Sequence, residues 1–162
     1  MQMNVDFTWH WHKWAAITCI VFGAKKKATD IFTDMLARDP NDVYALSSLA
    51  HLKAESGDQA GAVSVYQRLV SDERAPVSAW FNMGYLQQEL GNLSEAESSF
   101  RRALALNPKL DQAWYGLGLV LIEQGRLVDA TEALEQNTKL QPMSPYAWYQ
   151  LARVHLDRGA PD

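Results

Sequence analysis

The four histidines are the residues best suited to bind a metal or to act in acid–base catalysis. Their spacing argues against a metal site and against a catalytic site. His10 and His12 stand two residues apart, whereas two metal ligands on one helix face stand about four apart, and no cysteine or carboxylate completes a zinc set. His51 and His155 each lie in a predicted helix, near its surface, without a catalytic partner. The histidines therefore predict neither a metal site nor a nucleophilic enzyme.

Paired carboxylates and a pair of glycines are the remaining candidates for chemistry. Glu95 and Glu97 could act as acid and base, but they lie on the solvated face of a predicted helix. Gly116 and Gly118 are glycines of the kind that cradle phosphates, yet they fall inside a helical pattern, where a small residue serves packing. We expect no catalytic residue, no cofactor and no metal, so the chain is predicted not to be an enzyme.

The composition of the chain limits the classes of molecule that it is expected to bind. At 162 residues and 48% hydrophobic, the chain can bury a core. Its net charge of −4 and single basic run, 25–27, disfavour nucleic acid, which needs clustered lysine and arginine. The lone Cys19 cannot form an intrachain disulfide and lies in an apolar stretch, so it is predicted to be a small core residue.

A 34-residue repeat organises the whole sequence. One column is always glycine and a second is always alanine, at Gly23, Gly57, Gly91, Gly125 and Gly159, and at Ala28, Ala62, Ala96 and Ala130. With 9 glycines in 162 residues, four further hits at a fixed spacing would arise by chance about once in a hundred thousand chains. The repeat therefore has to be explained before any single residue.

Each repeat is predicted to be a pair of antiparallel helices. Glycine ends the first helix in a left-handed conformation, the alanine lies where the two helices approach, and proline stops the second helix at Pro40, Pro108 and Pro142. Asp42, Asp58 and Ser144 are predicted N-caps, with Pro145 at the first helical position. The predicted helices after the first are 25–38, 43–56, 59–70, 77–90, 93–106, 112–124, 127–140 and 146–157.

The spacing Trp-x2-Leu/Met-Gly, then Gly, then Ala-x3-Phe/Leu, then Pro resembles the tetratricopeptide repeat (TPR) family. The resemblance covers residues 9–158 and departs from the pattern at three places, where His12, Arg74 and Asn137 stand. It implies an all-α, right-handed α-α superhelix, a TPR solenoid of about four helix pairs and a closing C-terminal helix. The implied repeats are 9–42, 43–76, 77–110 and 111–144, with the closing helix at 145–158 and flexible tails at 1–8 and 159–162.

The resemblance also implies which surface binds. In TPR proteins the first helices of successive repeats line a concave groove, and here the inward positions are rich in aromatic residues, which are mediocre helix formers but enriched at interaction surfaces. We therefore expect a peptide-binding groove, with Tyr85, Tyr115 and Tyr149 forming one strip. The full predicted set is Tyr44, His51, Phe81, Asn82, Tyr85, Gln112, Tyr115, Tyr146, Tyr149 and Arg153.

One mode of TPR binding is not expected. TPRs that grip the acidic C-terminal tails of chaperones use lysine and asparagine on successive first helices as a carboxylate clamp. Asn82 matches one clamp position, but Ser47, His51, Gln112 and Gly116 stand at the other four. A terminal carboxylate is therefore not the predicted ligand.

The segment 9–24 has three interpretations. Its uncharged run, 14–24, is too short for a membrane-spanning helix, which needs about 20 residues. As a signal peptide it lacks a small-x-small cleavage site, and its lysines follow the apolar run instead of preceding it. As the first helix of a repeat it is in frame with the glycine column. We predict the repeat helix and a cytoplasmic protein; a periplasmic or membrane-associated protein is the alternative if 1–24 acts as a signal or anchor.

Together these patterns predict a non-catalytic scaffold that binds a protein or peptide. The alternatives are the TPR interaction region of a larger enzyme, such as a transferase, and a membrane-associated assembly factor. Nucleic-acid binding by a helical-repeat surface is a weaker alternative, and self-association through the terminal helices is left open.

Overall fold

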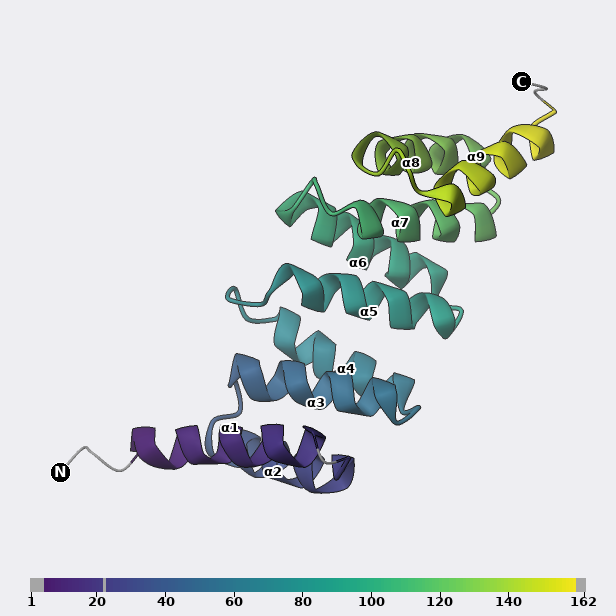
Figure 1. The fold of residues 1–162 in the computed structure, drawn as a ribbon. Helices are drawn as coiled ribbons and strands as arrows, with labels where there is room; N and C mark the ends of the chain where they lie inside the picture. The colour runs from purple at the N-terminus through teal and green to yellow at the C-terminus, as the bar shows by residue number, and fades with distance from the viewer. Residues whose placement is uncertain (1–4, 22, 160–162) are drawn as a thin grey trace. The chain divides into compact units, whose positions relative to one another are not determined.

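The computed structural model describes residues 5–21 and 23–159, and the side chains of 12–21 and 23–159 within them. All secondary structure in these ranges is α-helical (Figure 1). The helices are α1 (Val5–Val21), α2 (Lys25–Arg38), α3 (Val43–Glu55), α4 (Gln59–Val70), α5 (Val77–Glu89), α6 (Leu93–Leu106), α7 (Asp111–Glu123), α8 (Leu127–Leu140) and α9 (Pro145–Asp157).

The predicted helices are present, with small differences at their ends. The predicted bounds of α2, α4, α6 and α8 are unchanged, and those of α3, α5, α7 and α9 shift by one residue. The larger difference is α1, which begins at Val5, so that residues 5–8 of the predicted tail are helical. No proline or glycine in 5–8 stops the helix there. Residues 1–4 and 160–162 lie outside the described residues.

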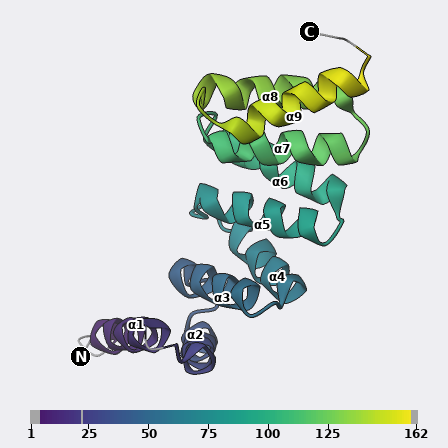
Figure 2. The same cartoon turned by 45° about the vertical axis from the view of Figure 1, so that its right-hand side comes forward.

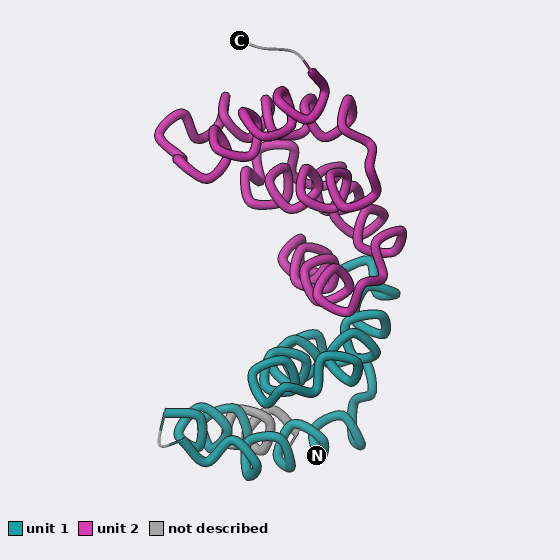
Figure 3. Tube along the Cα trace, turned by 90° about the vertical axis from the view of Figure 1, so that its right-hand side faces the viewer, with its two compact units in different colours: residues 1–75 teal, residues 76–162 magenta. Residues whose placement is uncertain are grey.

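The chain divides into two compact units, residues 1–75 and 76–162 (Figure 3). The first unit holds α1 to α4, and the second holds α5 to α9. In both units consecutive helices pack against each other in pairs, α1 with α2, α3 with α4, α5 with α6 and α7 with α8. In the second unit α5, α7 and α9, the first helices of three successive repeats, follow one another in order (Figures 1 and 2).

The glycine column ends the first helix of each pair. All five glycines have positive φ, between +70° and +86°, a region that costs a residue with a Cβ about 1–2 kcal/mol. At Gly125 the chain reverses through two hydrogen bonds, from Gly125 N to Ile122 O (2.9 Å) and from Arg126 N to Leu121 O (2.9 Å). The 34-residue period thus repeats a backbone conformation, as the sequence predicts.

Two of the predicted N-cap side chains make capping hydrogen bonds. The Asp42 carboxylate accepts a hydrogen bond from Ala45 N at 2.8 Å, and the Asp58 carboxylate accepts one from Gly61 N at 2.9 Å. Ser144 is the N-cap residue of α9 and Pro145 follows it, but the Ser144 hydroxyl makes no capping bond. The proline supplies the start of α9 by fixing φ.

The connector before α5 closes differently from the others. Arg74 stands where proline is expected, and its guanidinium donates to Asp72 Oδ1 from Nε (2.9 Å) and to Oδ2 from NH2 (2.7 Å). The Arg74 backbone N–H also donates to Asp72 Oδ1 (2.8 Å). An ion pair therefore orders the turn where other repeats use a proline.

This ion pair gives a pH-dependent expectation. Hydrogen bonds from the Arg74 side chain, then from its backbone N–H, lower the pKa of Asp72 to about 2. A lowered pKa contributes stability that is present above the unfolded pKa of about 3.9 and is lost as the pH falls through about 2. We expect Arg74→Ala to raise the pKa of Asp72 toward its ordinary value, measured by following the carboxyl carbon in an NMR titration. An unchanged Asp72 titration in this variant would contradict the ion pair.

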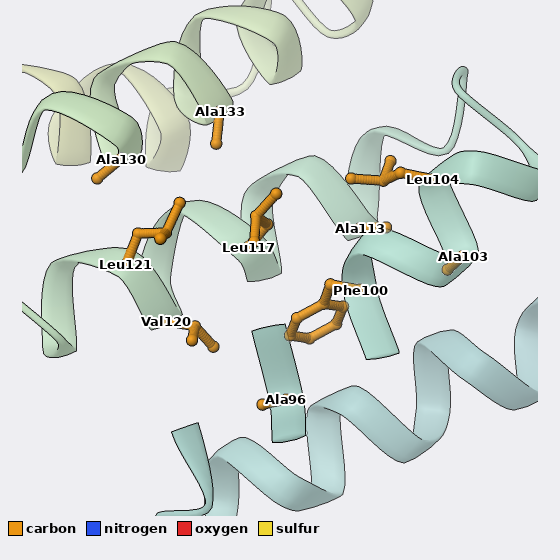
Figure 4. Packing of buried hydrophobic residues seen from close by; sticks show 10 residues of the cluster. All are labelled: Ala96, Phe100, Ala103, Leu104, Ala113, Leu117, Val120, Leu121, Ala130 and Ala133. Atoms are coloured by element: carbon orange, nitrogen blue, oxygen red, sulfur yellow. The ribbon is translucent and has the colours of Figure 1, made fainter. Parts of the chain in front are cut away.

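The core of the second unit is built around the alanine column. Ala96 and Ala130 are completely buried, and large side chains interleave with them (Figure 4). The cluster consists of Ala96, Phe100, Ala103, Leu104, Ala113, Leu117, Val120, Leu121, Ala130 and Ala133. The small residues let the helix axes approach, because a longer side chain in the same place would separate them.

Overpacking of this column should destabilise the fold. We expect Ala96→Leu and Ala130→Leu each to lower the free energy of unfolding by about 1–3 kcal/mol, because both sites have 0% exposure. Ala105→Leu, at an exposed site of α6, is the control and should change it by less than about 0.5 kcal/mol. Urea or thermal unfolding measures these changes. Equal stabilities for Ala96→Leu and Ala105→Leu would contradict the close packing of helices at Ala96.

The first unit has its own core, to which α1 contributes. Ala16 of α1 and Ala28 of α2 are both 0% exposed. The ring of Tyr44 meets that of Phe32 edge to face at 5.9 Å between centroids, and Lys13 Nζ lies 4.2 Å from the Tyr44 ring centroid. These contacts agree with the prediction that α1 is a repeat helix. Among the described residues, no helix is both long and apolar enough to cross a membrane.

Candidate functional site

A cleft of about 380 Å³ opens on α5, α7 and α9 of the second unit. This is within the range of about 300–1,000 Å³ usual for ligand sites. The lining residues, which we call the cleft set, are Phe81, Tyr85, Gln88, Phe100, Asp111, Gln112, Tyr115, Gly116, Leu119, Asn137, Gln141, Ser144 and Tyr146.

Aromatic rings form much of the cleft. Phe81 packs against Phe100 with ring centroids 5.9 Å apart. Tyr85 and Tyr146 are 51% and 72% exposed, so both amphipathic side chains are open to solvent. Tyr115 differs from them, because it also packs against the buried cluster of Leu134, Leu151 and Val154. The two exposed tyrosines are therefore available to a ligand, whereas Tyr115 is partly structural.

The floor of the cleft depends on a missing side chain. A Cβ added at Gly116 would lie 2.6 Å from Phe100 Cζ, closer than real contacts allow. Phe100 is 1% exposed and cannot move aside without disturbing the core (Figure 4). Gly116 is thus a packing residue, as predicted, and by its small size it leaves the Phe100 ring at the base of the cleft.

Asn137 contributes polar groups to the lining of the cleft. Its Nδ2 donates to the backbone carbonyl of Asp111 at 2.7 Å, while its Oδ1 is buried and has no hydrogen-bond partner. Asp111 is the one carboxylate in the cleft set, and no lysine, arginine or histidine belongs to that set. On the rim, Tyr85 OH donates to Glu89 (3.0 Å), and this bond to a carboxylate raises the pKa of the tyrosine.

Five of the ten predicted groove residues line this cleft: Phe81, Tyr85, Gln112, Tyr115 and Tyr146. The other five lie elsewhere. Tyr149 and Arg153 stack on each other along α9, 5.9 Å from guanidinium carbon to ring centroid. Asn82 is half-buried on α5 outside the lining. Tyr85 and Tyr115 of the expected strip line this cleft and Tyr149 does not, whereas Tyr146, three residues earlier on α9, does. The strip itself stays a prediction.

Two predicted residues belong to the first unit. The Tyr44 ring packs between Phe32 and Lys13, which is a structural position. His51 is exposed, and its Nε2 lies 3.3 Å from Glu55 Oε1. Each unit is a body of its own, so these two side chains are not assigned to the cleft of α5, α7 and α9.

Several cleft residues were not predicted, chiefly Gln88, Asp111, Asn137, Gln141 and Ser144. Most come from helix ends and second helices, which the first-helix rule leaves out. Asn137 alone carried a signal, because it replaces a small apolar residue of the repeat. Among the residues whose side chains are described, no group of three or more His, Cys, Asp or Glu could hold a metal ion.

Residues 46–160 match the family model of the Cilia and flagella-associated protein 70 middle TPR-like domain. The chain belongs to this family of TPR-like domains. Within the matched residues one contact recurs a repeat apart: Trp114 Nε1 donates to Pro108 O at 2.9 Å, and Trp148 Nε1 donates to Pro142 O at 2.8 Å. The tryptophan and proline columns of the TPR pattern thus meet in a hydrogen bond that joins a first helix to the preceding loop.

Solved structures share the TPR fold. The crystal structure of MamA has a TM-score of 0.86 at 23% identity, covering 90% of this chain and 85% of MamA. YrrB, described as a TPR protein with an unusual peptide-binding site, has a TM-score of 0.82 at 16% identity, with 91% and 76% covered. PilF of Pseudomonas aeruginosa has a TM-score of 0.76 at 19% identity, with 94% and 70% covered. These likenesses establish the all-α TPR solenoid fold. No curated protein sequence matches the chain.

Proposed function

We propose that this TPR-like domain is a non-catalytic scaffold that binds a segment of another protein in the cleft on α5, α7 and α9. The observation that carries the proposal is the exposure of Tyr85 on α5 and Tyr146 on α9, which line one cleft with the apolar residues of α7 between them. Exposed amphipathic rings give contact area at a small entropic cost, and such residues are enriched at interfaces.

The similarity to YrrB supports the same kind of ligand. YrrB is described as a TPR protein with an unusual peptide-binding site, so a protein of this fold can take a peptide. The cleft set also suits a peptide, because it combines apolar rings with amide and hydroxyl groups that can pair with a peptide backbone.

The test is selection of ligands by the full chain from a display library of random 12-residue peptides. We expect the wild type to enrich particular sequences, and Tyr146→Ala to bind the best of them about tenfold more weakly, through lost ring contacts. Tyr149→Ala is the matched control, since Tyr149 is on the same helix, is 62% exposed and does not line the cleft.

Both variants should keep their melting temperatures, because surface substitutions change stability by only about 0.5 kcal/mol. If Tyr149→Ala weakens binding and Tyr146→Ala does not, the ligand lies on another part of α9. If no sequence is enriched above background, the cleft is not a peptide site.

A further inference from the structure

We infer that the cleft takes a peptide with one apolar side chain next to a lysine or arginine, and that Asn137 Oδ1 accepts a hydrogen bond from that peptide. The inference rests on the proposed function and adds the class of ligand. Three features of the cleft support it: the apolar floor, the charge of the lining residues, and the unpartnered Oδ1 of Asn137.

The floor selects an apolar side chain. Phe81 and Leu119, both half-buried, supply apolar surface, and the buried Phe100 ring lies beneath, packed against Gly116. A charged group placed there would lose water without gaining a partner, because the floor offers no hydrogen-bonding side chain. A leucine, methionine or phenylalanine side chain would bury against these rings.

The charge around the cleft favours a basic neighbour. Asp111 is the one ionisable carboxylate of the cleft set, which contains no lysine, arginine or histidine. On the rim, Glu89 accepts from Tyr85 OH, and Glu123 accepts from Gln88 Nε2 at 2.6 Å. Asp111, in a lining that contains no cation, disfavours an acidic peptide and favours a basic one.

Asn137 is the feature that core packing does not explain. It is 3% exposed, and its amide orientation is fixed because Nδ2 donates to Asp111 O at 2.7 Å; a flipped amide would set oxygen against oxygen. Its Oδ1 therefore remains an acceptor without a partner. Buried polar atoms are nearly always paired, so an orphan in a cleft wall indicates that a ligand donor completes it.

The donor has a route to this oxygen. Tyr146 and Gln141 line the same cleft from the start of α9 and the loop before it, and both are exposed. Rotamer changes of such exposed side chains are fast, so the cleft beside Asn137 can adjust to admit a peptide N–H. The oxygen then gains a hydrogen bond in a site shielded from water, where such bonds are strong.

The experiment uses the peptides that the full chain selects. We expect the enriched sequences to share one Leu, Met or Phe beside Lys or Arg and to be depleted in Asp and Glu. Asn137→Leu should bind the best peptide about tenfold more weakly, which corresponds to about 1.4 kcal/mol. Its melting temperature should stay close to that of the wild type, because the substitution removes an unsatisfied buried oxygen together with the Nδ2 bond to Asp111 O, two effects of opposite sign.

Three further variants make the result specific. Gln136→Leu, the exposed neighbour on α8, is the control and should bind as the wild type does. Should Asn137→Leu not fold, Asn137→Ala takes its place with the same expected loss of affinity. Asp111→Asn should reduce the preference for lysine and arginine while the preference for an apolar residue stays.

The outcomes separate this inference from the proposed function. Enriched sequences that are acidic, or unchanged binding by Asn137→Leu, would overturn the inference even when Tyr146→Ala still loses the peptide. In that case the cleft binds peptides of another class. If the wild type enriches nothing, or Tyr146→Ala binds as well as the wild type, the proposed function itself fails.

Discussion

Replacing Phe100 by alanine should lower the free energy of unfolding of the second unit by about 3–5 kcal/mol, the range for a buried phenylalanine. The Phe100 ring is 1% exposed and packs against Phe81. It also fills the space above two glycines, since a Cβ at Gly84 or Gly116 would lie 3.1 Å or 2.6 Å from it. No other side chain can fill the vacated volume from these two positions, because glycine has none.

A double-mutant cycle with Gly116 tests this explanation. Gly116→Ala alone should destabilise the unit, because its Cβ meets the Phe100 ring, although alanine is the better helix former by about 1 kcal/mol. With Phe100→Leu, which is shorter, the added methyl group should be tolerated. Chemical denaturation of the four proteins gives the coupling energy. If the two effects simply add, the ring and Gly116 are not in contact.

Phe100 also connects the fold to the proposed function. Its ring belongs both to the buried cluster and to the floor of the cleft. A binding defect in Phe100→Ala would therefore have two causes. Tyr146→Ala, which alters an exposed ring, is the variant that reports on binding alone.

Much of the fold could be predicted because it depends on local requirements for a particular residue type. A helix that ends with positive φ needs glycine, and all five periodic glycines have that conformation. Close approach of two helices needs a small residue, and Ala28, Ala62, Ala96 and Ala130 are all completely buried. These constraints act within one repeat, so a single sequence with several repeats reveals them.

The cleft was less predictable because it is built across repeats. Asn137 on α8 contacts the backbone of Asp111, 26 residues earlier, and no spacing rule within one repeat brings these two together. The aromatic positions on first helices were predicted through the TPR resemblance, but the resemblance treats every first helix alike. It could not separate Tyr146, which lines the cleft, from Tyr149, which stacks on Arg153.

The repeat pattern also did not predict the division into two units. The period runs through residues 75 and 76 without interruption, so periodicity predicts a single solenoid. The departures at this place were visible, since Arg74 replaces the expected proline and 71–76 is the longest polar connector. Their consequence, that Tyr44 and His51 lie in a different unit from the cleft, depends on tertiary contacts and not on the period.

The repeat itself supplies the sharpest test of the packing argument. Gly118 and Ala152 occupy the same position one repeat apart. A Cβ at Gly118 would lie 2.8 Å from Leu134 Cδ2, and Leu134 is 0% exposed. Ala152 is exposed, because α9 has no second helix packed on this side within the described residues. A leucine should therefore be destabilising at position 118 and nearly neutral at position 152.

We expect Gly118→Leu to lower the free energy of unfolding by about 2 kcal/mol. Overpacking costs about 1–3 kcal/mol, and the Cβ alone is already too close to Leu134, so the cost lies near the top of that range. The better helix propensity of leucine returns less than about 1 kcal/mol. Ala152→Leu should change stability by less than about 0.5 kcal/mol. Thermal melts of both variants decide it, and a large loss in Ala152→Leu would show that the exposed face of α9 is covered in solution by a further helix.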